Sequence, residues 1–451
     1  MAEWRRTARQ VAALAWPVLV AQLAGIGMMV IDTRIVGHYA TLHLAAVAVG
    51  ASLYVSLMLG LAGIVQALGP CVAQALGAGK TEQIGPWVRQ GLWLSALLSV
   101  PGVFLLLNPH LMLDWVGVSP EVEALTAGYL QVLAICLPAS LCYRTFHAAA
   151  NAVGQPRPLM LLGLLQTMGH AVLALMLVPG QFGFPELGAL GAAASQAVMS
   201  WVSCCGGLLI LWKGKRWQIY RCFGAWSWPS LSQQKDLLRL GIPMGLSYMV
   251  EITAFTFVAL FIARLGADVM SAHRIVANIS VITYMLPLSI GTATSVLVAQ
   301  SVGGGREAEA RNISMVGMTM AAAGATLLGG LVWCFRETLA TFASTDPVVA
   351  ALAASLMFYV AIYQCADGIQ TVAGFALRGY KVTFLPLLIH LTGFWGVGLG
   401  LGYVLAFKTD PPGGVAGFWQ GTVLSTVFAA LFLGVLLRWV MRNRQPLHFS
   451  Q

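Results

Sequence analysis

The sequence predicts an all-α polytopic membrane protein whose twelve transmembrane helices form two six-helix lobes. Composition is the first reason: the 451 residues are 58% hydrophobic and only 9% charged, with a mean hydropathy of +0.79. Uncharged apolar runs of about 20 residues, the length that crosses a hydrocarbon core as a helix, recur along the whole chain. Short segments of the first half also recur in the second half at one constant offset.

Twelve apolar runs are the expected spans. The first has a basic start and a long apolar body without a clean cleavage site, so we interpret it as a retained helix and not as a signal peptide. The spans are expected near residues 11–33, 43–69, 90–107, 122–145, 159–178, 189–212, 238–262, 270–295, 312–334, 349–377, 383–406 and 415–437.

The basic residues predict the orientation of these spans. Of the 25 lysines and arginines, twenty, Arg378 and Arg444 among them, fall on the side of the N-terminus, and five fall on the other side: Arg34, Arg264, Arg274, Arg336 and Lys408. This asymmetry places both termini and the basic segment 213–236 in the cytoplasm. The net charge of +9 therefore reflects the orientation of the spans in the membrane, and nucleic acid is not an expected partner.

The internal repeat pairs segments of the two halves at one constant offset. "GPCVAQALGAGK" (69–80) aligns with "SVLVAQSVGGGR" (295–306), and the same offset pairs Pro17 with Pro243 and Gly188 with Gly414. Halves with an even number of helices start on the same side of the membrane, a design found in secondary transporters. We expect an N-terminal lobe over 1–212, a cytoplasmic basic linker over 213–236 and a C-terminal lobe over 237–451.

Motifs for nucleotides, cofactors and enzymatic chemistry are missing from the sequence. The run "LGAGKT" ends like a phosphate-binding loop, but Gln74 stands where that loop needs a glycine. The eight cysteines have neither disulfide-type nor metal-ligand spacing. We therefore expect no enzyme and no cofactor, and any energy for transport has to come from an ion gradient.

Three acidic residues lie inside the expected spans. Thirteen of the sixteen acids fall in loops or at helix ends, and Asp32, Glu251 and Asp367 remain. An ionised carboxylate in hydrocarbon costs several kcal/mol or more, so each of the three must be protonated, paired or facing a polar cavity. A functional role is the default expectation for such residues.

Glu251 lies near the middle of its span, in "LSYMVEITAF". Its neighbours one turn away are Ser247 and Phe255, which place a hydroxyl and an aromatic ring on the same helix face. Both are candidate substrate contacts. The alternative is a structural glutamic acid, held neutral by a hydrogen bond to an adjacent helix.

Asp367 lies in a long uncharged run with Tyr363 and Thr371 one turn to either side, so three oxygen-bearing side chains share one stripe. A structural role is the alternative here too. Tyr284 is a further candidate, because an aromatic ring face near a carboxylate can hold an organic cation.

Asp32 lies near the outer end of the first span, two residues before Arg34. A pair of charges in the headgroup region would need no function, but residues two apart point to different helix faces, so Arg34 need not neutralise Asp32. The histidines inside spans, His170 and His390, are expected to be hydrogen-bonded interior side chains and not metal ligands.

At these residues the chain resembles the multidrug and toxic compound extrusion (MATE) transporters of the NorM-like branch. The resemblance covers nearly the whole chain, and "IDTRIVG", "VEITAF" and "YQCADGIQTVAGFALRGYK" carry it. It implies a V-shaped protein with two pseudo-symmetric lobes. It also implies a secondary antiporter that exports amphipathic, often cationic, compounds in exchange for Na⁺ or H⁺ by alternating access.

The resemblance also implies roles for particular residues. Glu251, Asp367 and Tyr363 match the cation site of the C-terminal lobe, and Asp32 matches the carboxylate of the N-terminal lobe. Tyr284 and Asp346 match positions implicated in drug or ion contact.

The chain departs from the family pattern in the fifth helix, where Gln166 and His170 stand in place of the asparagines found in many members. Arg34 is an uncommon neighbour of the first-helix aspartate. These departures bear on the role of Asp32.

We expect Glu251 and Asp367 to converge on one polar cavity, where two carboxylates in a low dielectric cannot both stay ionised without a cation nearby. A proton, a sodium ion bound by both carboxylates, or an organic cation would compete for the site. We expect a monomer in the lipid bilayer with small-molecule substrates. A lipid-linked precursor flippase or a metabolite exporter of related fold is the alternative, although a flippase would need several interior cations.

Overall fold

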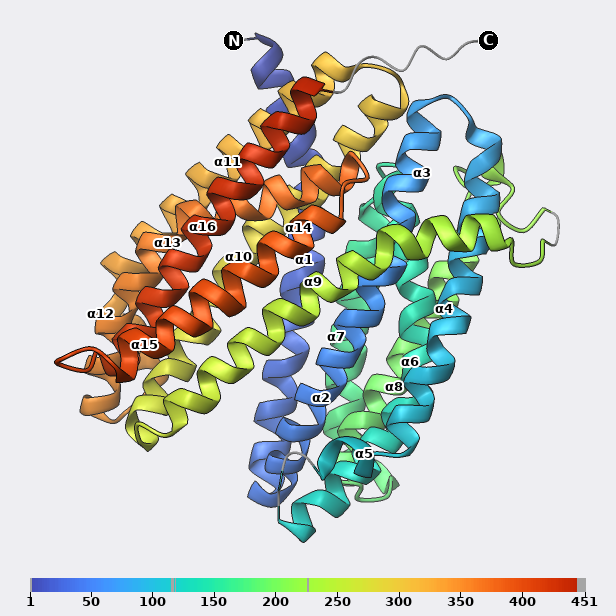
Figure 1. Ribbon diagram of the computed structural model, residues 1–451. Coiled ribbons are helices and arrows are strands. Elements are labelled where there is room, and N and C mark those ends of the chain that lie inside the picture. The colour runs from blue at the N-terminus through green and yellow to red at the C-terminus, as the bar shows by residue number, and fades with distance from the viewer. Residues whose placement is uncertain (1, 115–116, 118, 225–226, 444–451) are drawn as a thin grey trace. The chain divides into compact units, whose positions relative to one another are not determined.

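The computed structural model describes residues 2–114, 117, 119–224 and 227–443, and all regular structure in these ranges is helical (Figure 1). Twelve helices in the described ranges are long and apolar enough to cross a membrane, which confirms the predicted number of spans. Several are longer than predicted, because polar and glycine-rich ends continue the helices beyond their apolar centres. Arg444 and the C-terminal end, assigned to the cytoplasmic side, lie outside the described residues.

Six spans make up the first half of the chain. Its long helices are α1 (Ala2–Tyr39), α2 (Thr41–Val65), α4 (Ile84–Leu107), α6 (Pro120–Ala152), α7 (Arg157–Leu177) and α8 (Ala189–Lys213). Short elements connect them: α3 (Leu68–Gly77), η1 (Thr81–Gln83), α5 (His110–Leu113), η2 (Gln181–Gly183) and η3 (Gln218–Tyr220).

The second half contributes the other six spans. Its long helices are α9 (Leu231–Ala263), α10 (Ala267–Gly303), α11 (Glu307–Cys334), α13 (Pro347–Gly379) and α16 (Gly414–Asn443), with the short α12 (Arg336–Ala343) between two of them. The eleventh span combines α14 (Phe384–His390), a π-helical segment η4 (Leu391–Leu401) and α15 (Gly402–Phe407).

The chain packs as two compact units. The N-terminal unit is Val20–Gly245, and the C-terminal unit combines Met1–Leu19 with Leu246–Gln451. The expected lobes divide the chain at 213–236, whereas the units divide inside α1 and α9. The reason lies in side-chain contacts: Asn312 Nδ2 donates to Thr7 Oγ1 over 3.2 Å, so the start of α1 packs with helices of the second half.

Backbone conformations repeat between the two halves at the offset seen in the sequence. Gly79 and Gly305 both have left-handed φ values, +73° and +69°. Gly188 and Gly414, which are paired by the same offset, have φ values of +54° and +55°. Left-handed backbone is nearly free of strain only for glycine, which explains why these positions keep it in both halves.

Close helix packing positions the middle of α13. A Cβ atom on Gly368 would lie 2.8 Å from the carbonyl oxygen of Ala321 on α11, and one on Gly379 would lie 2.7 Å from the carbonyl oxygen of Ser295 on α10. Small residues allow membrane helices to approach this closely. Asp367, next to Gly368, is therefore held on a helix with little freedom to shift.

The loop 214–230 between α8 and α9, which is the part of the expected linker 213–236 that lies outside these two helices, is held on α4 by Arg89. The Arg89 guanidinium donates to Ser227 Oγ over 2.7 Å, and to the carbonyl oxygens of Arg221 and Cys222 over 3.1 and 3.0 Å. A charged donor that satisfies three acceptors holds loop backbone more firmly than neutral bonds do.

Gln90 and Trp93 extend this attachment. The Gln90 amide donates to Trp228 O over 3.0 Å and accepts from Ser230 N over 2.9 Å. Trp93 Nε1 donates to Ser227 O over 3.0 Å, and its ring stacks on Trp228 with centroids 6.0 Å apart. The described part of this segment is thus a packed element of the N-terminal unit.

Arg89→Ala should release the segment and expose the Cys222 thiol. Cys222 is buried, and burial raises the pKa of its thiol to about 11, so little reactive thiolate forms at pH 7.5. We expect Arg89→Ala to speed alkylation of Cys222 by a hydrophilic maleimide by about tenfold or more, because both burial and the raised pKa are lost. Peptide mass spectrometry resolves Cys222 from the other cysteines. Arg216→Ala, which changes an exposed arginine of the same segment, is the control, and equal rates in both variants would contradict this role of Arg89.

Candidate functional site

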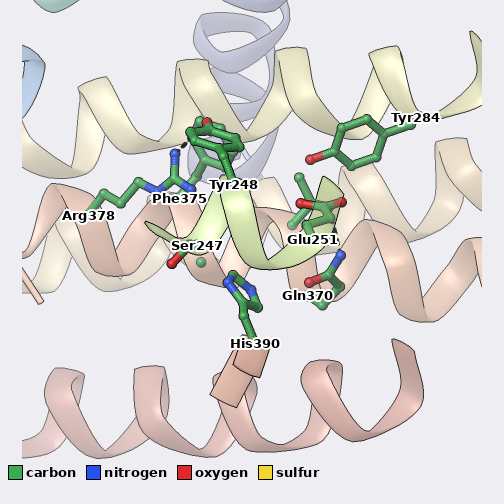
Figure 2. Close-up of a pocket in the computed structure, with 10 residues that line it drawn as sticks. Ser247, Tyr248, Glu251, Tyr284, Gln370, Phe375, Arg378 and His390 are labelled. Atoms are coloured by element: carbon green, nitrogen blue, oxygen red, sulfur yellow. Dashed lines mark hydrogen bonds between the residues drawn. The ribbon is translucent and has the colours of Figure 1, made fainter. Parts of the chain in front are cut away.

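A polar cavity in the C-terminal unit is the candidate site (Figure 2). Residues of α9, α10, α13 and α14 line it: Ser247, Tyr248, Glu251, Tyr284, Gln370, Thr371, Gly374, Phe375, Arg378 and His390. The space between its walls, counted together with open solvent at its mouth, is about 330 Å³. Carboxylate, hydroxyl, amide, imidazole and guanidinium groups therefore share one space inside spans that are otherwise apolar.

Glu251 faces this cavity. Figure 2 shows its carboxylate between the hydroxyl of Tyr284 and the amide of Gln370. Ser247, one turn earlier on α9, lines the same space, as the helical spacing of the two residues requires. The costly carboxylate in the middle of α9 is thus placed where water, an ion or a ligand can reach it.

Asp367 lies behind the cavity wall on α13. It is 8% exposed, and its Oδ1 accepts a hydrogen bond of 3.0 Å from Gln370 Nε2. Gln370 itself lines the cavity, so its amide connects the buried carboxylate with the cavity space. The charge of Asp367 also acts on Glu251, so the two acids lie within electrostatic reach of each other.

Tyr284 and Tyr363 have different surroundings, since only Tyr284 lines the cavity. Tyr284 lines the cavity, where the charges of both Glu251 and Asp367 act on it. Tyr363, one turn before Asp367, is buried in the apolar core of the unit, and its hydroxyl is hydrogen-bonded to Ser280 of α10. Tyr363 therefore belongs to the packed interior of the unit and does not line the described cavity.

Two expected contact residues lie elsewhere in the C-terminal unit. Phe255 is 46% exposed and packs on Phe394 with ring centroids 6.3 Å apart, outside the cavity lining. Asp346 is exposed at the start of α13, where its carboxylate accepts hydrogen bonds from Val348 N over 2.8 Å and Val349 N over 3.4 Å. Asp346 is the N-cap of α13 in this structure, an ordinary structural position for an aspartate.

Asp32 belongs to the N-terminal unit, where it pairs with His170. Asp32 Oδ1 lies 2.7 Å from His170 Nε2, and Ser195 Oγ lies 3.1 Å from His170 Nδ1. Ser195 donates its own hydrogen to the Ala192 carbonyl oxygen over 2.8 Å, so Nδ1 is the donor to Ser195. Nε2 and the Asp32 carboxylate are hydrogen-bonded to each other, so Asp32 has a partner inside the protein.

Arg34 stays apart from this pair. Its side chain is exposed, and within the described ranges the ion pair of Asp32 is with His170. Gln166, one turn before His170, accepts a 3.2 Å hydrogen bond from Ser203 of α8. The fifth-helix positions that depart from the family pattern therefore bond to α1 and α8.

Sequence reasoning missed Arg378, Tyr248 and His390 as cavity residues. Arg378 belongs to the predicted inner-side charges, yet it is 9% exposed and lines the cavity. The missed signal is helical spacing, because Arg378 follows Asp367 by eleven residues, close to three full turns on one helix face. Side chains also tilt toward the helix N-terminus, which carries the guanidinium back into the cavity.

His170→Leu should destabilise the N-terminal unit, because Asp32 and Ser195 both lose their partner. We expect a loss of about 1–3 kcal/mol, seen as a lower thermal unfolding midpoint in detergent. Asp32→Asn added to His170→Leu should then cost little more, since the shared interaction is already gone. Fully additive losses in the double variant would contradict the pairing.

Comparison with known families gives a match in each half of the chain. A family model described as MatE matches residues 17–176 and 243–404. The two matches begin at Pro17 and Pro243, the prolines that the internal repeat pairs, and the second match contains Glu251 and Asp367.

Curated relatives match over nearly their whole length. The chain is 46% identical over 434 residues to a probable multidrug resistance protein NorM of Aromatoleum aromaticum, covering 96% of this chain and 94% of the relative. It is 33% identical to the multidrug resistance protein NorM of Vibrio cholerae, covering 98% of each chain.

Solved structures share the fold. The eukaryotic MATE transporter AtDTX14 superposes with a TM-score of 0.87 at 21% identity over 98% of both chains. An outward-facing MATE transporter of the MOP superfamily superposes with a TM-score of 0.88 at 18% identity, over 97% of this chain and 96% of that one. With twelve spans, a repeated MatE match and relatives of this identity, the chain is a multi-pass membrane protein that belongs to the MATE family, in its NorM-like branch.

Proposed function

We propose that this protein is a secondary active antiporter that exports amphipathic, often cationic, compounds in exchange for Na⁺ or H⁺. The observation that carries the proposal is the placement of Glu251 in a polar cavity, with Asp367 within electrostatic reach. The names of the relatives, multidrug resistance proteins, support the substrate class.

Competition for one site couples export of the compound to entry of the ion. Glu251 and Asp367 together favour a positive guest, because two acids in a space of low dielectric gain most from a neutralising charge. A proton, a sodium ion or an organic cation supplies that charge, and each excludes the others. Tyr284, which lines the cavity with Glu251, is suited to contact an organic cation with its aromatic ring.

The coupling ion is either Na⁺ or H⁺. Sodium prefers hard oxygen ligands, and Ser247, Thr371 and the Gln370 amide supply such oxygens near Glu251. A proton needs only a carboxylate. Imposing an Na⁺ gradient and a pH gradient separately on proteoliposomes distinguishes the two, since only the coupling gradient drives drug accumulation.

A flippase for lipid-linked precursors is less well supported. Binding a pyrophosphate would require several cations, and in the described part of the chain Arg378 is the single Lys or Arg side chain that lines the cavity. The same cavity holds Glu251, which would repel phosphate.

We further propose that the N-terminus and the 214–230 segment face the cytoplasm of a bacterial inner membrane, as the distribution of Lys and Arg indicates. An impermeant maleimide should then label Cys222 of the Arg89→Ala variant in inverted vesicles and leave it unlabelled in right-side-out vesicles. The opposite pattern would reverse the proposed orientation.

Glu251→Gln and Asp367→Asn should each uncouple transport, because the neutral side chains no longer require a cation. We expect ion-driven drug efflux in proteoliposomes to fall by about tenfold or more in both variants. Glu82→Gln, which changes an exposed acid outside the cavity, is the control and should retain wild-type efflux. Unchanged coupling in both site variants would rule out this mechanism.

A further inference from the structure

The cavity contains a permanent cation. The guanidinium of Arg378 donates from Nη1 to the Tyr248 hydroxyl over 2.7 Å and lies over the rings of Phe375 and Tyr248, 4.3 and 4.9 Å from their centroids. Figure 2 shows these three side chains together at one end of the site. Arginine stays protonated in proteins, so this positive charge is always present.

Arg378 has no direct acidic partner. Among the described residues, ion pairs within 4.0 Å involve His170, Arg306 and Arg336, and none involves Arg378. Its close contacts, Tyr248 and Phe375, are neutral. Its charge acts on Glu251 across the cavity, so the guanidinium is balanced by the acids of the site at a distance.

Among the described residues, six groups that can carry charge line the cavity or act on it. They are Tyr248 and Glu251 on α9, Tyr284 on α10, Asp367 and Arg378 on α13, and His390 on α14. The phenols are neutral at neutral pH, and an imidazole buried near a guanidinium favours its neutral form. Two carboxylates and one guanidinium leave a net charge of minus one when both acids are ionised.

We propose that Arg378 limits the site to one positive charge at a time. One proton, one sodium ion or one monovalent organic cation makes the cavity neutral. A second positive charge would be left unbalanced in a space of low dielectric, where uncompensated charge is costly. This inference rests on the proposed function and adds the charge class of its substrates.

Two consequences follow for transport through this site. Monovalent compounds are preferred over divalent ones of similar shape. Exchange of one monovalent compound for one proton or sodium ion moves no net charge, so the chemical gradient of the ion drives it.

The wild-type protein permits a first test by calorimetry. Ethidium, a monovalent cation, is titrated into detergent-solubilised protein in sodium-free buffers of different ionisation enthalpy, which counts the protons released per bound ligand. We expect at most one proton. Release of two protons would overturn the proposal without any variant.

Arg378→Gln permits a second test, because it raises the net charge of the site to minus two. Propidium carries the ring system of ethidium and a second positive charge. We expect the ratio of the two dissociation constants to shift toward propidium by about tenfold or more in Arg378→Gln. Arg378→Lys keeps the charge and should keep the wild-type ratio. The double variant Arg378→Gln/Glu251→Gln returns the net charge to minus one and should restore the preference for ethidium.

Failure of the inference is distinguishable from failure of the proposed function. If Arg378→Gln is monodisperse and keeps the wild-type ratio of the dissociation constants for ethidium and propidium, the charge limit is wrong while antiport at this site stands. If Glu251→Gln and Asp367→Asn leave ethidium binding unchanged, the site itself is wrong. Should Arg378→Gln fail to fold, the proton count of the wild type decides.

Discussion

The cost of a carboxylate inside a membrane-spanning helix constrains both units of this protein. Hydrocarbon cannot solvate an ionised acid, so each such residue must share a proton, find an internal partner or face a polar space. Asp32 has an internal partner, the buried imidazole of His170 at 2.7 Å. Glu251 faces a polar cavity, and Asp367 lies behind the cavity wall, where Gln370 donates a hydrogen bond to it. Most of the proposed mechanism depends on this difference between Asp32, which is paired inside the protein, and Glu251, which faces a cavity.

The internal repeat relates the folds of the two halves, but the acidic residues of one half have no acidic counterparts in the other. At the offset that pairs Pro17 with Pro243, Glu251 corresponds to Gly25 and Asp32 corresponds to Val258. Matching glycines instead fix matching backbone turns, as those of the Gly188 and Gly414 pair do. The shared fold is therefore set by small residues and helix ends, whereas a few polar side chains give each unit its own site. In the C-terminal unit these side chains combine acids with a guanidinium, and this combination determines what charge the site can accept.

The sequence predicts the spans and the importance of Glu251 and Asp367 because both follow from the cost of polarity in lipid. It does not predict partners that come from distant helices. His170 is 138 residues from Asp32, and only the packing of α1 beside α7 and α8 shows that the two are hydrogen-bonded. Helical spacing places Arg378 on the same face as Asp367, but its side chain is long and flexible, so spacing alone does not predict its contacts with Tyr248 and Phe375. The 214–230 segment has the composition of a loose basic loop, and contacts with Arg89, Gln90 and Trp93 are what fix it.

Mutual exclusion of ion and compound at one site is the central claim, and equilibrium competition measures it most directly. Ethidium binding to purified protein is recorded over a series of Na⁺ concentrations at constant pH, and over a series of pH values without Na⁺. We expect the apparent dissociation constant to rise without limit, in proportion to the concentration of the coupling ion. An effect that saturates, or affinity that neither ion changes, would contradict a shared site.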